Sequence, residues 1–202
     1  MKKLTRQFYA QKDVVSIARQ LIGKIVVTQF EGVRTSGRIV ETEAYVAFTD
    51  RASHAFAGRR TARNEPMYAA PGTAYIYICY GLHQMLNVVT NEVNIPDAVL
   101  IRAIEPLEGI DKMLERTGKS NQDFTLTKGP GNVAKALGIF KRHSGLHLSG
   151  SELYLTEDDH HELNPEHIAS SVRIGIDSAG EDAALPYRFF LKANKYVSGR
   201  IR

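Results

Sequence analysis

Alternation between apolar and polar positions predicts that most of this chain forms β-strands. Residues 24–30 favour a strand, and Glu31–Gly32 favours a turn into a second strand that begins near Gly37. These two strands are expected to pair as a hairpin. Further strands are expected at 73–80, 82–90, 98–104, 152–156 and 172–176. Tyr80–Gly81 separates two of them, which predicts a tight hairpin with Tyr80 near its tip.

Helical spacing is confined to three shorter segments. Asp13 is a suitable N-cap for a helix of apolar period that Gly23 ends. Residues 107–116 predict a second helix ending near Gly118, and residues 128–139 predict a turn followed by a short third helix. Helices therefore supplement a chain that is organised around strands.

One predicted strand is unusually polar on one face. Glu41, Glu43 and Tyr45 are two residues apart, so their side chains should point to the same side. The following loop holds Asp50 and His54, and these groups can converge on one pocket. The alternative is a half-exposed strand with its acids in water and a loop histidine without a task, since such strands are common.

A long segment in which apolar residues follow neither a helical nor a strand period comes after that strand. Residues 47–72 are rich in Ala, Arg, Gly and Pro, and are too long to be a mere connection. Loops of this length inside a compact domain are usually functional or disordered. We therefore expect part of a binding site, or a disordered stretch, in this segment.

Arg102 is the one charged residue in the apolar run at 98–104. An arginine buried in a strand needs a partner or a cleft. The alternative is an arginine at the strand end whose head group reaches water. The sequence leaves both interpretations open.

Two other motifs are candidate ligand sites. Residues 129–131, Gly-Pro-Gly, precede a helix and can hold an anion on free N–H groups, although a simple helix-start turn explains them better. They match no P-loop or dinucleotide fingerprint, so no nucleotide cofactor is indicated. His160, His161 and His167 lack a nearby cysteine and a standard ligand spacing, which favours a solvated loop over a metal site.

Composition is that of an ordinary globular protein. The chain has 202 residues, 43% hydrophobic and 24% charged, which fits one domain over residues 1–202. Its single cysteine, Cys79, excludes an intrachain disulfide. No apolar run approaches the ~20 residues that span a bilayer, and the basic start lacks the apolar core of a signal peptide. We expect a cytoplasmic protein without membrane contact.

Charge is unevenly distributed around a net value of +4. Basic residues without acids occupy 51–64 and 186–202, whereas 151–172 contains acids and no Lys or Arg. One basic face would suit a polyanion; the alternative is a surface of patchy charge. The arginines of the first basic segment are Arg51, Arg59, Arg60 and Arg63.

Ten motifs in a fixed order resemble those of the alkyladenine (3-methylpurine) DNA glycosylases. The resemblance extends from about Ile22 to Ser198. The motifs are RIVETEAY at 38–45, DRASH at 50–54, GRRTARN at 58–64, MYAAPG at 67–72, AYIYICYG at 74–81, LN at 86–87, VLIRAIEP at 99–106, GPG at 129–131, RIGID at 173–177 and PYRFF at 186–190.

The resemblance implies a role for each matching residue. Glu43 would be the general base for an attacking water, and Arg102 would lie near that water and the target nucleotide's backbone. Tyr80 would wedge into the duplex. The flipped base would be held by Tyr45, His54 and Tyr77 as walls, by backbone groups of Ala52 and His54, and by Asn87 as a floor whose amide disfavours guanine.

The resemblance, more than the strand pattern, implies the fold and activity. It implies an α+β fold: a single mixed domain around a curved, mostly antiparallel sheet with flanking helices. It implies a monomer that needs no metal or other cofactor, associates with the nucleoid, and hydrolyses damaged purines from double-stranded DNA. The core motifs contain no lysine, so no strand-nicking lyase activity is expected. The four arginines at 51–63 would hold phosphates, which position a protein without reading sequence.

Two other functions remain open from the residues alone. Glu41, Glu43, Asp50 and His54 can be the ligands of a metal-dependent nuclease. A non-catalytic nucleic-acid-binding module would use the sheet aromatics, although Glu43 beside phosphates would cost affinity. The chain also departs from the family pattern at 47–49, Asn132 and Tyr187, which can shift base preference or DNA affinity.

Overall fold

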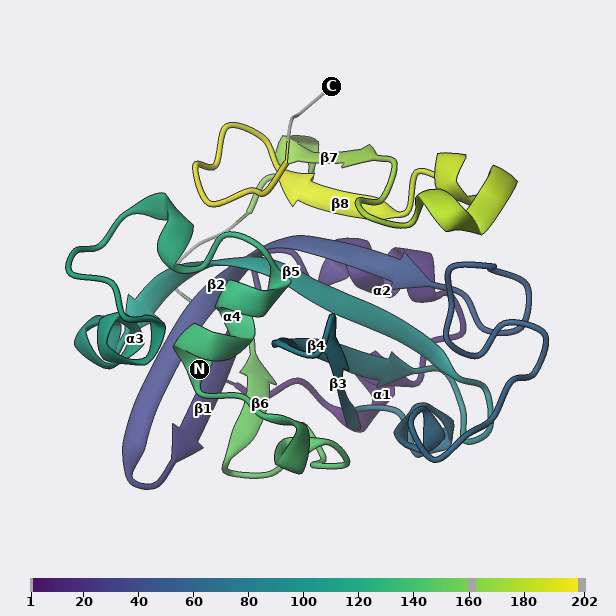
Figure 1. Cartoon of the computed structure of the whole chain (residues 1–202), viewed down its shortest axis with the longest axis horizontal. Helices are drawn as coiled ribbons and strands as arrows, with labels where there is room; N and C mark the ends of the chain where they lie inside the picture. Colours follow the sequence, from purple (N-terminus) through teal and green to yellow (C-terminus); the bar gives the residue numbers. More distant parts are fainter. Residues whose placement is uncertain (1, 160–162, 200–202) are drawn as a thin grey trace.

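The computed structural model describes residues 2–159 and 163–199, and its main feature is one β-sheet (Figure 1). The strands are β1 (Ile25–Phe30), β2 (Val33–Tyr45), β3 (Ala74–Cys79), β4 (His83–Thr90), β5 (Asp97–Glu108), β6 (Leu153–Thr156), β7 (Ile168–Ser171) and β8 (Arg188–Leu191). Their order is β3-β4-β5-β2-β1-β6, and β8 joins β2 to β7. The strand pairs are antiparallel, which confirms the expected α+β class.

Short helices cover this sheet. The α-helices are α1 (Arg6–Tyr9), α2 (Val14–Gln20), α3 (Ile110–Thr117) and α4 (Pro130–Leu137). The 3-10 helices are η1 (Glu65–Tyr68), η2 (Phe124–Leu126), η3 (Lys141–His143), η4 (Pro165–His167) and η5 (Asp177–Ala184). In Figure 1, α4 lies in front of the sheet and α2 behind it, so apolar side chains of both helices enter the core. Within the described ranges, no helix is long and apolar enough to cross a membrane.

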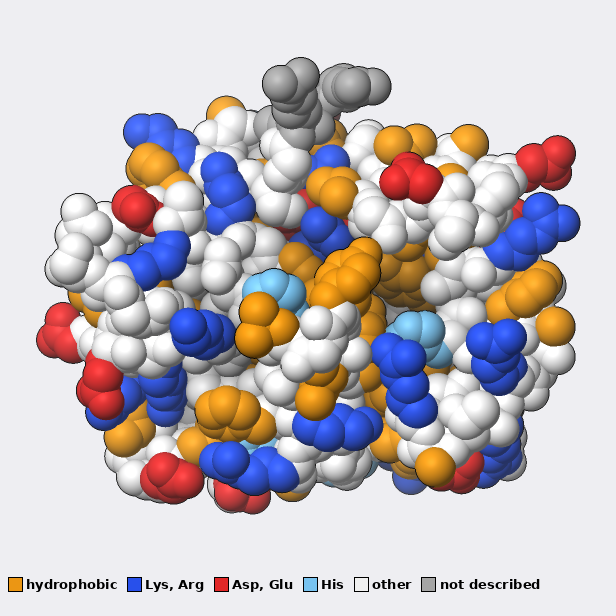
Figure 2. Space-filling view, in the orientation of Figure 1, with side chains coloured by type: hydrophobic (Ala, Val, Ile, Leu, Met, Phe, Trp, Pro, Cys, Tyr) orange, Lys and Arg blue, Asp and Glu red, His pale blue; other side chains and the backbone are white. Residues whose placement is uncertain are grey.

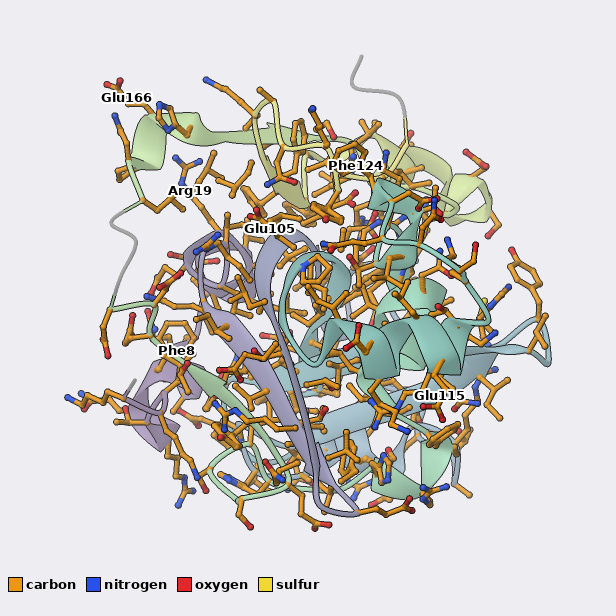
Figure 3. The ribbon with its side chains drawn as sticks, turned by 90° about the vertical axis from the view of Figure 1, so that its left-hand side faces the viewer. Phe8, Arg19, Glu105, Glu115, Phe124 and Glu166 are labelled. Atoms are coloured by element: carbon orange, nitrogen blue, oxygen red, sulfur yellow. The ribbon has the colours of Figure 1, made fainter. Side chains whose placement is uncertain are left out.

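Capping and turn residues act as the sequence predicts. The Asp13 carboxylate accepts hydrogen bonds from the N–H groups of Val15 and Ser16 at 3.0 and 3.1 Å, which satisfies two free donors at the start of α2. Residues 31–32 form the turn of the β1–β2 hairpin. Arg19 of α2 donates to the carbonyl of Pro165 at 3.0 Å, so η4 lies beside α2 (Figure 3).

The β3–β4 hairpin is as expected. Cys79 pairs with His83, which leaves residues 80–82 as the connection. Tyr80 has a φ of 50° and its side chain is 91% exposed, while Leu82 beside it is 74% exposed. Two large apolar side chains therefore project from the tip of a hairpin that is otherwise paired.

Two predictions about local structure were wrong. Residues 107–108 continue β5, and α3 begins after Gly109, whose φ of 73° and close contact with Arg34 favour glycine. Residues 172–176 form a loop, because Gly175 has a φ of 76° and the chain leaves the sheet after Ser171.

The sheet has a junction at the middle of its longest strand. The first half of β2 pairs with β1, and residues 41–43 pair with β8 on the same side, while β5 pairs along the other side. The β2–β5 register shifts on both sides of Glu41. Both long strands bend along their length (Figure 1). The acidic face of β2 thus lies where three strands meet.

Candidate active site

The two acids of β2 are inside the protein. Glu41 and Glu43 are both 0% exposed, and both contact the guanidinium of Arg102. The expectation that they share one side of the strand is confirmed. The alternative of acids in water is wrong, because the guanidiniums of Arg102 and Arg188 and the backbone at residues 174 and 198 surround the two carboxylates.

Glu43 is held by three donors. Its Oε1 accepts the N–H of Ile174 at 2.8 Å. Its Oε2 accepts the hydroxyl of Tyr45 at 2.8 Å and Nη1 of Arg102 at 3.2 Å. A buried carboxylate requires such partners, because removing its hydration is costly. The side chain is therefore fixed in direction as well as compensated in charge.

Tyr45 supplies both a hydroxyl and a ring to the site. Burial, followed by the charge of Glu43, raises the pKa of the Tyr45 hydroxyl well above its usual value. The hydroxyl therefore stays protonated and donates to Glu43. The guanidinium of Arg173 lies 4.9 Å from the centroid of the Tyr45 ring. This contact fixes the plane of the ring.

A narrow slot lies beside these groups and opens into a wider cleft. The slot has a volume of about 20 Å³, and the cleft has about 460 Å³. Tyr45, Ala52, His54 and Tyr77 line both, so the two are continuous. The remaining slot residues are Met67, Tyr75, Asn87 and Ala98. Figure 2 shows a hollow on this face with Lys and Arg side chains around it, while most visible acids lie nearer the outline.

Glu43 lies directly behind this cleft without lining it. Tyr45, Arg102 and Ile174 line the cleft, and each donates a hydrogen bond to the Glu43 carboxylate. Arg102 is 8% exposed and lies in mid-strand, so the alternative of a strand-end arginine in water is wrong. The carboxylate is one side chain away from any molecule in the cleft.

His54 is a neutral wall of the slot. Its Nδ1 hydrogen-bonds the hydroxyl of Tyr75 at 2.8 Å, and its ring meets the ring of Tyr77 edge-on at 4.5 Å. Burial lowers the pKa of His54 to about 4, and the nearby charges of Arg63 and Arg59 contribute. At neutral pH the imidazole carries no charge.

Asn87 closes the slot with a fixed amide. The side chain is 4% exposed, and its Nδ2 donates to the carbonyls of Tyr75 and Met85 at 3.1 and 3.2 Å. Both amide protons are therefore used by the backbone. The amide cannot turn over to present its N–H₂ group to the slot.

Asp50 organises the loop instead of joining the acids. It forms a buried ion pair with Arg173, with contacts of 2.5 and 2.9 Å, and its Oδ1 accepts the N–H of Ala52 at 3.0 Å. The proposed metal ligands Glu41, Glu43, Asp50 and His54 are thus not gathered around one point. Among residues 2–159 and 163–199, no three His, Cys, Asp or Glu side chains could hold a metal ion.

The remaining candidates for binding have different surroundings. His160 and His161 lie outside the described residues, and His167 ends η4. The Gly-Pro-Gly turn at 129–131 opens α4 as expected, and Pro130 lines the cleft. None of these observations assigns an anion to the turn.

The four arginines at 51–63 differ in availability. Arg60 is held by both carboxylate oxygens of Glu65, at 2.9 and 2.5 Å. Arg51 and Arg63 line the cleft, and Arg63 lies 5.4 Å from the centroid of the Tyr77 ring. Arg59 contributes its charge near His54. Arg51 and Arg63 are the two placed to meet a ligand in the cleft.

Several residues of the site were missed from the sequence. Tyr75 has the same strand parity as Tyr77, so a signal for it existed. Arg173 and Ile174 belong to the RIGID motif at 173–177, but the sequence assigned them no role, because their segment was interpreted as a strand. Ser198 was missed because nothing local connects it to Glu41.

Fold and site together define a class: a protein built on an antiparallel sheet, with a slot lined by aromatic side chains and backed by a buried carboxylate. Comparison with known proteins agrees. Residues 7–195 match the family model described as methylpurine-DNA glycosylase (MPG). The chain belongs to this DNA glycosylase family.

Its bacterial relatives are similar over nearly their whole length. A protein of Desulfitobacterium hafniense (strain Y51) is 44% identical over 98% of this chain and 99% of its own. One of Chlamydia felis (strain Fe/C-56) is 44% identical over 95% and 97%, respectively. One of Bacillus cytotoxicus is 42% identical over the same shares, 95% and 97%. All three are provisionally named 3-methyladenine DNA glycosylases.

Proposed function

We propose that this protein is a monofunctional DNA glycosylase of base excision repair that removes alkylated purines, such as 3-methyladenine, from duplex DNA. It would hydrolyse the N-glycosidic bond and leave an abasic site. The observation that carries the proposal is the buried Glu43 carboxylate, fixed by Tyr45, Arg102 and Ile174 directly behind an aromatic slot.

The slot requires an extruded base. Extruding a nucleotide costs a few kcal/mol, and less for a damaged pair. Stacking on an aromatic face returns about 1–3 kcal/mol per base, and Tyr45 and Tyr77 line the slot. A base that is cationic through alkylation gains about 0.5–2 kcal/mol more by cation–π attraction. Because His54 is neutral, it does not repel such a cation.

Glu43 has two tasks in this reaction. It takes a proton from the attacking water, and its charge stabilises the oxocarbenium-like sugar of the transition state. Glu43 is 0% exposed, so binding must admit a water beside it. Arg102 lines the cleft, and Arg102 and Tyr45 donate to the same oxygen of Glu43. A shift of the Arg102 side chain would therefore open a position for water beside this oxygen.

The residues around the cleft support DNA contact. Tyr80 projects from the hairpin tip and would fill the space that the base leaves, as wedge residues do. Arg51 and Arg63 line the cleft and would contact phosphates. Neither the slot nor the cleft has a lysine among its lining residues, so no Schiff base and no strand nicking are expected.

The test uses duplexes that each carry one defined lesion, with excess chelator present. We expect alkali-sensitive abasic sites in the wild-type reaction and no nicks before alkali. Glu43→Gln should keep duplex binding and lose base release by about 10²–10⁴-fold, the usual contribution of a general base.

Other outcomes would separate the alternatives. Strand cleavage that chelator stops would indicate a metal-dependent nuclease. Binding without release of any alkylated purine would indicate a non-catalytic module. Near-wild-type release by Glu43→Gln would contradict the assignment of Glu43.

A further inference from the structure

A second buried carboxylate lies behind the site and has no task in the proposed reaction. Glu41 is 0% exposed and is two residues before Glu43 on β2. It lines neither the slot nor the cleft, so it does not touch a ligand there. Burying a carboxylate is costly, so its presence needs an explanation.

Glu41 joins three segments that are far apart in the sequence. Its Oε1 accepts Nε of Arg188 at 2.6 Å, Oγ of Ser198 at 3.0 Å and Nε of Arg102 at 3.3 Å. Its Oε2 accepts the N–H of Ser198 at 2.8 Å. Strand β5, strand β8 and the chain after β8 are all attached to this one side chain.

Arg102 is shared between the two acids. Its Nε points to Glu41 and its Nη1 to Glu43, at 3.3 and 3.2 Å. A guanidinium is planar and rigid, so fixing Nε also fixes the direction of Nη1. Arg102 lines the cleft, so it links the buried Glu41 to the place where chemistry would occur.

Arg188 completes the charge balance without touching Glu43. Its Nη2 donates to the carbonyl of Ser198 at 2.5 Å and its Nη1 to Oγ of Ser171 at 2.9 Å. Two carboxylates and two guanidiniums thus occupy one buried volume. Without the charge of Glu41, Arg102 would be attracted to Glu43 alone and would close on it.

We propose that Glu41 is a positioning residue for base release. It holds Arg102 from the far side, which keeps the Arg102 contact with Oε2 of Glu43 at 3.2 Å from tightening, so that a water can take this position when Arg102 shifts, and Ser198 fixes Glu41 in turn. This inference rests on the proposed function. It makes Ser198, which lines neither the slot nor the cleft, part of the active-site support.

The test compares two Glu→Gln variants in single-turnover base release with excess enzyme. Glu41→Gln keeps the shape of the side chain and removes its charge. The control is Glu105→Gln. Glu105, labelled in Figure 3, lies on β5 and also pairs with an arginine of β2, at 3.0 Å. It lines neither the slot nor the cleft.

Glu41→Gln should lower the rate constant for base release from the bound substrate by about 10–100-fold, as expected for a small misplacement at a reacting centre. Its Kd for duplex should stay within about twofold of wild type, since no DNA contact is lost. Glu105→Gln should keep both values. A merely structural role would lower the folded fraction or the affinity and leave the rate constant of the bound complex unchanged.

A crystal structure of Glu41→Gln gives a second readout, in which the guanidinium of Arg102 should lie closer to Oε2 of Glu43 than the 3.2 Å of wild type. Two outcomes would overturn this inference and leave the proposed function standing. In one, Glu41→Gln releases the base as fast as wild type. In the other, Glu105→Gln releases it as slowly as Glu41→Gln. If wild type releases nothing, the proposed function fails. If Glu41→Gln does not fold, Ser198→Ala serves instead, because it removes the Oγ contacts and keeps the N–H. A full rate in Ser198→Ala would overturn the inference.

Discussion

The pocket has two halves that are held in different ways. The sheet-borne half lies on paired strands and comprises Glu43, Tyr45, Tyr77, Asn87 and Arg102. The loop-borne half lies on irregular segments and comprises Ala52, His54 and Ile174. Backbone ladders fix the first half, and side-chain contacts fix the second.

The buried pair of Asp50 and Arg173 is the main support of the loop-borne half. Asp50 accepts the N–H of Ala52, and Arg173 donates to the carbonyl of Ala44 at 2.9 Å and precedes Ile174. This pair ties the 50–54 loop to the 173–175 loop and to the end of β2. The comparison teaches that half of the pocket is held by a buried ion pair together with single contacts such as His54 to Tyr75 and Ile174 to Glu43.

The largest effect is expected from Asp50→Asn, which leaves the Arg173 charge buried without its partner. Breaking such a pair on one side costs about 3–5 kcal/mol of folding stability. Chemical denaturation should show this loss. The control is Glu65→Gln, which removes an exposed acid–arginine pair from the surface and should leave the denaturation midpoint nearly unchanged, because water screens such a pair.

A double variant sharpens this prediction. Asp50→Asn combined with Arg173→Gln removes both charges, so it should be more stable than Asp50→Asn alone. If the double variant is as unstable as the single one, the ion pair is not what holds the loops together.

The two halves also differ in how well the sequence predicts them. Parity placed Glu41, Glu43 and Tyr45 on one side of β2, because a strand has a fixed period of two. The same rule also places Tyr75 on the side of β3 that carries Tyr77. Burial of the acids was not predictable, since β8 and Ser198 come from the other end of the chain.

Local patterns gave little information about the loops. The apolar alternation at 172–176 favoured a strand, but Arg173 is directed to Asp50 and the N–H of Ile174 to Glu43. Tertiary contacts therefore override a weak strand preference here. The resemblance to a family supplied Ala52 and His54 of this half but not Ile174, and the structure supplies the ion pair that holds the two loops together.

The hairpin tip gives the next largest effect. Tyr80→Ala should leave stability unchanged, because the side chain is 91% exposed. Opening a base step costs a few kcal/mol, so the loss of a wedge should slow release from duplex DNA by about tenfold or more. Release from single strands should change little.

Leu82→Ala is the matched control at the same tip, since Leu82 is 74% exposed. Its effect on duplex substrates should be smaller. Equal losses on duplex and single strands for Tyr80→Ala would contradict the wedge.

A smaller effect concerns pH and the loop-borne half. The pKa of His54 is about 4 in the folded protein, against an ordinary value of 6.5. Between these values the unfolded chain binds the extra proton, so stability is full above pH 6.5 and falls as the pH drops toward 4. The loss approaches about 1.4 kcal/mol per pH unit inside this window. Denaturation at pH 7 and 5.5 should show a larger loss for wild type than for His54→Gln, in which His143, whose pKa is also lowered by burial, still contributes. An equal loss in both proteins would exclude a contribution from His54.

The smallest effect compares two arginines of the 51–63 segment. Arg63 lines the cleft, whereas the guanidinium of Arg60 is held by Glu65 and lies 4.4 Å from the centroid of the Tyr68 ring. If Arg63 contacts a phosphate, Arg63→Gln should reduce the slope of log K against log salt by about 1, because one fewer counterion is released.

Arg60→Gln should change that slope less, since Arg60 must first leave Glu65 to meet a phosphate. Both variants keep the sheet-borne half intact, so the difference isolates the loop's contribution to DNA binding. Equal slopes for Arg63→Gln and wild type would remove Arg63 from the phosphate contacts. A larger change for Arg60→Gln would mean that DNA displaces Glu65, and the loop would then rearrange on binding in a way that the paired strands cannot.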